Sequence, residues 1–173
     1  MEPIHPLEQF LNLSVVLTGF NRVELQATGV GREYLNLLVE MAGDTLCFEL
    51  WAETRVIYAK HAGHTGRLER EVNERILKSA KYAPLARNII LMWYNAIWYQ
   101  LPPGWTTTHG ANALDQDQVI SAKAYPEALV WQVMGAHPPA AKPQGFGAWA
   151  LPPVGAGPPP RSAPRKAAPG GKA

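Results

Sequence analysis

The chain has few side chains whose type and spacing could carry out a reaction. A thiol hydrolase needs a cysteine beside a base, and Cys47 is the only cysteine present. Because Cys47 falls among apolar neighbours in a helical pattern, we interpret it as a core residue. The sequence lacks a Gly-x-Ser-x-Gly motif, and residues 29–35, GVGREYL, lack the third glycine of a dinucleotide-binding loop. These patterns predict no catalytic and no cofactor-binding residue in this chain.

Histidines are the remaining candidates for chemistry, as ligands of a metal ion. His61 and His64 lie three residues apart at the predicted end of a helix, and His109 lies in a predicted loop. A metalloprotease helix needs two histidines four apart with a glutamate between them, and a di-iron bundle needs Glu-x-x-His on two helices. Neither spacing occurs, so we predict no metal ligand. A small metal-binding protein or metalloenzyme built on these three histidines stays as the alternative.

The composition describes a chain that can bury a core. Of the 173 residues, 47% are hydrophobic, and 16 Lys plus Arg against 14 Asp plus Glu give a net charge of +2. That charge is too small to imply a nucleic-acid partner. The length suits one domain at roughly 150 residues per domain.

The spacing of apolar residues predicts the helices that must position the candidate side chains. Pro6 suits a first turn, Gly19 a helix end, Thr28 and Asp44 N-caps, and Gly43 a helix stop. Helices are therefore predicted at about residues 6–18, 29–42, 44–60, 67–79, 84–100 and 119–134. Pro126 implies that the last helix either starts at Pro126 or is kinked there. No alternating run is long enough to predict a sheet, and the helix at 84–100 is apolar all round, which indicates a central or covered position. The predicted fold is an all-α bundle of five or six helices.

The C-terminal part departs from this pattern. Residues 137–153 predict an irregular arm in which Phe146 and Trp149 stand among turn-forming residues, and we assign residues 1–153 to one domain that includes it. Residues 154–173 hold five Pro and four Gly with four basic residues and no acid. This composition predicts a disordered, solvated tail. Its four cations also allow a basic tether to an acidic partner or a membrane surface.

No membrane span or export signal is predicted from this chain. Its most hydrophobic segment, residues 89–99, is about half the ~20 residues that cross a bilayer. The opening residues MEPIHPLEQFLNLS have neither the apolar run of a secretory signal nor a twin arginine.

Six tryptophans are many for a chain of this size, and five of them fall between residues 93 and 149. Tryptophan is enriched at the energetic centres of protein interfaces. Composition alone leaves two interpretations open, a partner surface or the domain's own core.

Three segments together resemble the small (gamma) subunits of bacterial membrane-bound flavin-dependent sugar and polyol dehydrogenase complexes, such as sorbitol and glucose dehydrogenases. The segments are FLNLSVVLTG at residues 10–19, LARNIILMWYNAIW at residues 85–98, and YPEALVWQVMGAHPPAAKPQGFGAWALPP at residues 125–153.

The resemblance implies that this chain is not the catalyst. In that family a large subunit with bound FAD oxidises the sugar or alcohol, and a cytochrome c subunit with haem often carries the electrons onward. The small subunit binds the large one, helps its maturation, and carries the twin-arginine signal for export to the periplasmic side of the inner membrane. Since this sequence has no such motif, its compartment stays open. The side chains that we expect at the partner interface are Trp93, Tyr94, Trp98, Trp131, Phe146 and Trp149.

Overall fold

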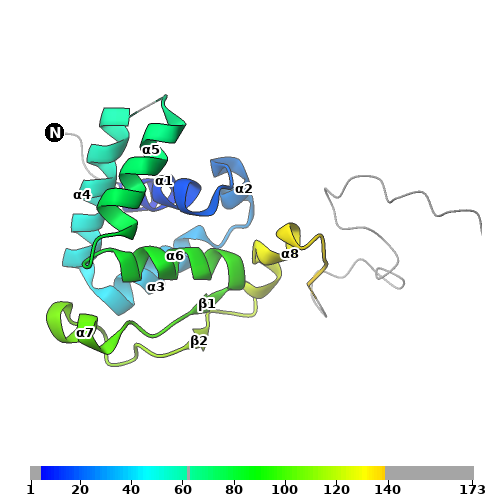
Figure 1. Cartoon of the computed structure of the whole chain (residues 1–173). Helices are drawn as coiled ribbons and strands as arrows, with labels where there is room; N and C mark the ends of the chain where they lie inside the picture. Colours follow the sequence, from blue (N-terminus) through cyan, green and yellow to red (C-terminus); the bar gives the residue numbers. More distant parts are fainter. Residues whose placement is uncertain (1–4, 62, 139–173) are drawn as a thin grey trace, which may run out of the picture.

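A computed structural model describes residues 5–61 and 63–138, and these residues form a mainly helical fold, as predicted (Figure 1). The helices are more numerous and shorter than expected, and one small antiparallel strand pair joins them. In chain order the elements are α1 Pro6–Thr18, α2 Arg22–Ala27, α3 Gly31–Ala42, α4 Asp44–His61, α5 Thr65–Val72, the π-helix η1 Asn73–Leu77, α6 Ala83–Asn95, β1 Ile97–Trp98, α7 Pro103–His109, β2 Gln118–Val119, the 3-10 helix η2 Tyr125–Glu127 and α8 Val130–Val133.

The N-terminal helices follow their local signals closely. Helix α1 begins at Pro6 and ends before Gly19, which takes a left-handed conformation with φ of 77°. Helix α4 runs from Asp44 to His61, so Asp44 is its first helical residue and not the residue before it, as the predicted N-cap would be.

The segment between α1 and α3 corrects one prediction. Thr28 does not cap the second long helix, which begins at Gly31. A short helix that the periodicity did not indicate, α2, comes first, and Asn21 caps it in a reciprocal capping box with Glu24. Thr28 ends α2, and its hydroxyl donates to the Leu25 carbonyl at 2.7 Å.

Helix α6 occupies the central position that its all-round apolar sequence predicted, since it packs against α1, α3, η1 and β1. It ends at Asn95, not near Gln100, because Ala96 adopts a left-handed conformation with φ of 56°. The next residues form β1, which pairs with β2 so that Ile97 faces Val119 and Trp98 faces Gln118. Two-residue strands are too short to leave an alternating pattern in the sequence.

The region after α6 also differs from the prediction. The expected loop contains helix α7, and the expected helix at 119–134 is wrong. Val119 lies in β2, and Pro126 lacks the N–H that a continuous helix needs, so the chain forms a single 3-10 turn at Tyr125–Glu127. Only Val130–Val133 are α-helical, as α8.

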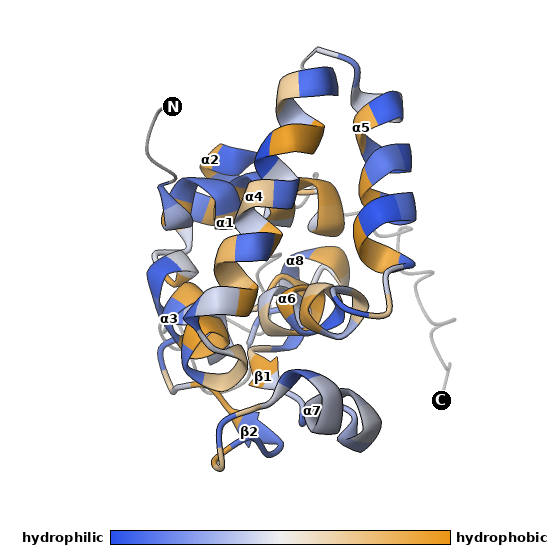
Figure 2. Ribbon diagram, turned by 90° about the vertical axis from the view of Figure 1, so that its left-hand side faces the viewer, coloured by the Kyte–Doolittle hydropathy of each residue, from blue (hydrophilic) through white to orange (hydrophobic). Residues whose placement is uncertain are grey.

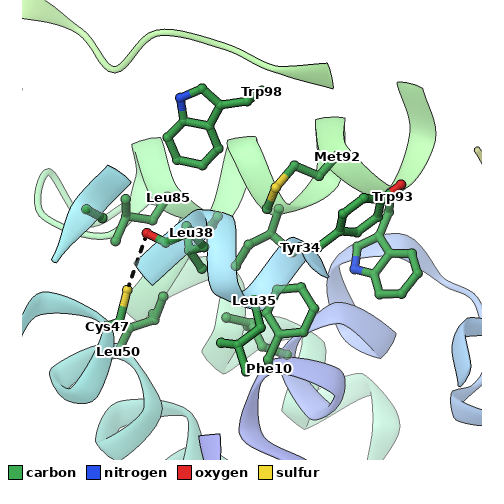
Figure 3. Packing of buried hydrophobic residues seen from close by; sticks show 14 of the residues in the cluster. Phe10, Tyr34, Leu35, Leu38, Cys47, Leu50, Leu85, Met92, Trp93 and Trp98 are labelled. Atoms are coloured by element: carbon green, nitrogen blue, oxygen red, sulfur yellow. Dashed lines mark hydrogen bonds between the residues drawn. The ribbon is translucent and has the colours of Figure 1, made fainter. Parts of the chain in front are cut away.

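Most of the tryptophans lie in the domain's own core. Trp51, Trp93, Trp98 and Trp105 are buried together with Phe10 and Tyr34. Figure 3 shows the aromatic group at its centre, where Trp93 stacks on Phe10 with ring centroids 6.1 Å apart and meets the Tyr34 ring edge-on at 5.0 Å. Of the predicted arm, only His137 and Pro138 are among the described residues, and the predicted tail lies outside them.

Candidate partner interface

Trp93 and Trp98, two of the expected interface residues, have no exposed surface. The Trp93 Nε1–H donates to the Ser14 hydroxyl at 2.9 Å, and that hydroxyl donates to the Phe10 carbonyl at 2.7 Å. The indole also contacts two rings of this chain, Phe10 and Tyr34. Trp93 therefore ties α6 to α1 and is not available to a partner in this conformation.

Trp98 is held by a buried carboxylate from a distant loop. Its Nε1–H donates to Asp115 Oδ1 at 2.8 Å, and the Leu101 N–H donates to Asp115 Oδ2 at 3.0 Å. Asp115 itself is only 7% exposed. This arrangement closes the loop after β1 over the core, so Trp98 is also a packing residue.

Tyr94, near the C-terminal end of α6, and Trp131, on α8, are both half-buried. The Tyr94 hydroxyl donates to the Thr18 carbonyl at 2.8 Å, and its ring meets Phe20 edge-on at 6.2 Å. The Trp131 Nε1–H donates to the Tyr125 carbonyl at 2.9 Å. Their polar atoms are satisfied within the chain while part of each ring stays accessible, as at many interfaces.

Sequence reasoning missed the most exposed apolar residues of this region. Val133 and Met134 are 63% and 68% exposed, although the predicted helix placed them with buried neighbours. The Leu129 N–H donates to the Trp93 carbonyl at 2.9 Å, which fixes the start of α8 to the end of α6. Pro126 was the one signal that could have shortened the helix. The accessible apolar side chains near the junction of α6 and α8 are Phe20, Tyr94, Trp131, Val133 and Met134, and we call this set the apolar end.

Phe146 and Trp149, the remaining two expected interface residues, lie outside the described residues.

The single thiol is in an unreactive position. Cys47 is 1% exposed and its Sγ lies 3.8 Å from the Leu38 carbonyl (Figure 3). Burial, with a smaller contribution from the negative charge of Asp44, raises the pKa of Cys47 to about 12. The reactive thiolate is therefore strongly disfavoured.

The histidines do not assemble a metal centre within residues 5–61 and 63–138, where no group of three His, Cys, Asp or Glu side chains could hold an ion. His61 approaches Glu71 at 4.0 Å, and the His109 ring packs on Trp105 with centroids 5.0 Å apart. Within the described residues, His61, His64 and His109 therefore do not form the metal-binding cluster that the alternative hypothesis requires.

Two hollows on the surface lack the geometry of an active site. One, of about 520 Å³, is lined by α3 residues of mixed charge that include Arg32 and Glu33, together with Lys123. In the other, of about 450 Å³, Asp115 is committed to Trp98, and the hydroxyls of Thr106 and Thr107 both donate to the Pro103 carbonyl. Neither hollow brings a nucleophile together with a base.

No known protein-family model, curated protein or solved structure matches this chain. Within the described part of the chain, none of the helices combines the length and the apolar character that crossing a bilayer requires.

Proposed function

We propose that this chain is a non-catalytic accessory subunit of a flavin-dependent sugar or polyol dehydrogenase complex, in which it binds and stabilises the large subunit and helps its maturation or export. In this proposal FAD belongs to the large subunit and haem to a cytochrome c subunit. The chain itself supplies packing surface and no reacting group.

The observation that supports the proposal best is where the three family-like segments meet. Trp93 of the second segment donates to Ser14 of the first, and Tyr94 donates to Thr18. The third segment joins them through the hydrogen bond from Leu129 to the Trp93 carbonyl. The hydrogen-bonded residues of these segments are 36 to 79 positions apart in sequence and converge on the C-terminal end of α6.

The residues of these three segments divide into buried ones, which hold the helices together, and exposed ones, which a partner could contact. Phe10, Ser14 and Trp93 are buried and hold the helices together. Val133 and Met134 are exposed on the same end of the molecule, next to the point where the described chain stops at Pro138. Apolar residues in such a position favour a protein partner.

The stabilising role follows from mass action. A partner that binds only the folded form stabilises it by an amount that grows with the partner's concentration over its dissociation constant, about 2.7 kcal/mol at a hundredfold excess. Permanent complexes of this type bury upward of about 2,000 Å². The apolar end would be part of such an interface, and Phe146 and Trp149 remain our further candidates for it.

The test is co-expression of the chain with the flavin-binding large subunit of its own gene cluster, followed by affinity capture through the small chain. We expect the captured complex to contain FAD and to oxidise a sugar or polyol with an artificial electron acceptor, whereas the small chain alone does neither. Failure of the unaltered chain to capture a flavoprotein would overturn the proposal.

A matched pair of variants tests the location. Val133→Glu with Met134→Glu places two charges on the apolar end and should lower recovery of the large subunit at least tenfold, equivalent to about 1.4 kcal/mol of binding free energy. Val23→Glu is the control, because Val23 on α2 is 74% exposed and outside the apolar end. Equal recovery from both variants would contradict this placement of the interface.

A further inference from the structure

Helix α4, which lies on the near side of the bundle in Figure 2, carries a second group of exposed apolar side chains. Phe48 is 57% exposed and Val56 is 48% exposed, although both are large apolar side chains. Ala52 lies between them and is half-buried, and Thr45 and Ala59 are exposed. We call this stripe, made of Thr45, Phe48, Ala52, Val56 and Ala59, the α4 seam.

The spacing of the α4 seam is that of a helix-packing surface. Its positions follow one another at intervals of three, four, four and three residues, so they form one continuous stripe along the helix. The opposite face of α4 is already buried in the core through Leu46, Leu50 and Ile57. A helix that is apolar on both faces is typical of one covered on both sides. Alanine at the middle of the stripe allows a second helix to approach closely.

We propose that the α4 seam is a self-association surface, on which two copies of this chain pack α4 antiparallel with Ala52 at the two-fold axis. In this register a residue before Ala52 lies at the level of the residue equally far after it in the second copy. Phe48 then packs beside Val56, and Thr45 beside Ala59. The two Ala52 residues meet at the axis, and a Phe48–Val56 pair lies on each side of them.

The charges along the α4 seam select this orientation. Glu49, whose carboxylate also pairs with Lys81 of its own chain, and Lys60 flank the stripe on one side, and Asp44 and Arg55 flank it on the other. An antiparallel pair brings equivalent flanks together in reverse order, so Glu49 lies toward Lys60 of the second copy.

On the other flank of the same antiparallel pair, Arg55 lies toward Asp44 of the second copy. A parallel pair would instead set Glu49 toward Asp44 and Lys60 toward Arg55, which places like charges together. Such exposed pairs add little affinity, but they decide register and partner orientation.

The size of the seam predicts a reversible dimer. Helix α4 has 18 residues and at 1.5 Å per residue is about 27 Å long. One helix face from each copy buries less than the roughly 1,200 Å² of stable complexes. We therefore expect dimers that form and dissociate with concentration, independently of any other subunit.

Sedimentation of the purified full chain over a concentration series tests the association. The mass should rise from that of the 19.0 kDa monomer toward twice that value. Ala52→Glu places two carboxylates at the axis and should weaken the dimer at least about tenfold, while Val23→Glu, on exposed α2, should leave it unchanged. A chain that stays monomeric throughout, or an equal effect of both variants, would overturn the proposal.

Disulfide trapping tests the orientation with the same full chain. Native Cys47 is 1% exposed and does not compete. Ala52→Cys should cross-link with itself under mild oxidation, because only cysteines with Cα atoms within about 7 Å can bridge. Thr45→Cys should cross-link with Ala59→Cys in a mixture but not with itself. Cross-linking of Thr45→Cys with itself would show that the two helices are parallel. If Ala52→Cys forms no more cross-linked dimer than Val23→Cys, the α4 seam is not the association surface.

Discussion

Single polar residues in the interior of this protein connect segments that are far apart in sequence. Asp115 is the strongest example, since its two oxygens accept from the Trp98 indole and from the Leu101 N–H, 14 or more residues away. Ser14 has the same role between α1 and α6, where it accepts from Trp93. A buried donor left without its acceptor costs about 1–3 kcal/mol, so these residues contribute more than their size suggests.

Asp115→Ala should therefore lower the free energy of unfolding by about 3 kcal/mol, because it leaves two buried donors unsatisfied. Asp117→Ala is the matched control. Asp117 also accepts a backbone N–H, that of Gln100 at 2.8 Å, but this site is exposed and water can replace the carboxylate. Urea unfolding followed by tryptophan fluorescence measures the free energy of unfolding of both variants. An equal decrease in the two variants would contradict the stabilising role of Asp115 as a buried acceptor.

The buried Cys47 and the half-buried Tyr58 predict how stability depends on alkaline pH. Burial raises the pKa of Cys47 from 9.0 to about 12 and the pKa of Tyr58 from 10.0 to about 12, with Arg22 opposing the shift at Tyr58. Both groups hold their protons more tightly in the folded state than in the unfolded state. Their contribution to the free energy of unfolding is therefore complete below about pH 9 and is lost as the pH rises toward about 12.

Urea midpoints between about pH 8 and pH 11 measure this loss. The double variant Cys47→Ala with Tyr58→Phe removes both groups, and we expect a flatter dependence on pH. An unaltered chain that is equally stable at both ends of this range would contradict the prediction.

At the scale of elements, the end of α6 determines the course of the second half of the fold. Ala96 has φ of 56° and ψ of 33°, a conformation that an alanine adopts at a cost of roughly 1–2 kcal/mol. Its carbonyl accepts from the Ile120 N–H at 3.0 Å, so the turn also positions the strand pair. Ala86, in the middle of the same helix, is equally buried but has ordinary helical geometry.

Glycine substitutions at these two alanines isolate the backbone contribution. Each removes one buried methyl group, but only Ala96→Gly relieves a left-handed conformation, and only Ala86→Gly weakens a helix interior. Ala86→Gly should therefore be more destabilising than Ala96→Gly by about 2 kcal/mol in urea unfolding. Equal effects would show that Ala96 carries no strain.

At the scale of the whole molecule, the two proposed surfaces lie at opposite ends of the fold. Figure 1 shows α4 on the left and α8 on the right, with the core helices between them. A partner on the apolar end would leave the α4 seam accessible. Association of the chain with itself would therefore be compatible with capture of a large subunit, and each can be abolished by its own variant.

Local signals predicted the first part of the fold well. Gly19, Gly43 and Asp44 end or begin helices where they should, because capping depends only on neighbouring residues. The all-round apolar character of residues 84–95 likewise indicated a central helix. The later elements were predicted poorly, since α7, the strand pair and α8 are short and depend on distant contacts with Asp115 and Trp93.

The candidate interface divides in the same way. Composition and motif order identified a set of aromatic side chains, and the absence of catalytic motifs follows from the sequence alone. Which rings face solvent was decided by tertiary packing. Trp93 and Trp98 are enclosed, and their indole N–H groups bond to Ser14 and Asp115 from far along the chain, while Val133 and Met134 are exposed at the end of α8. Sequence spacing determines which residues share a helix face, but burial depends on what the rest of the chain places against that face.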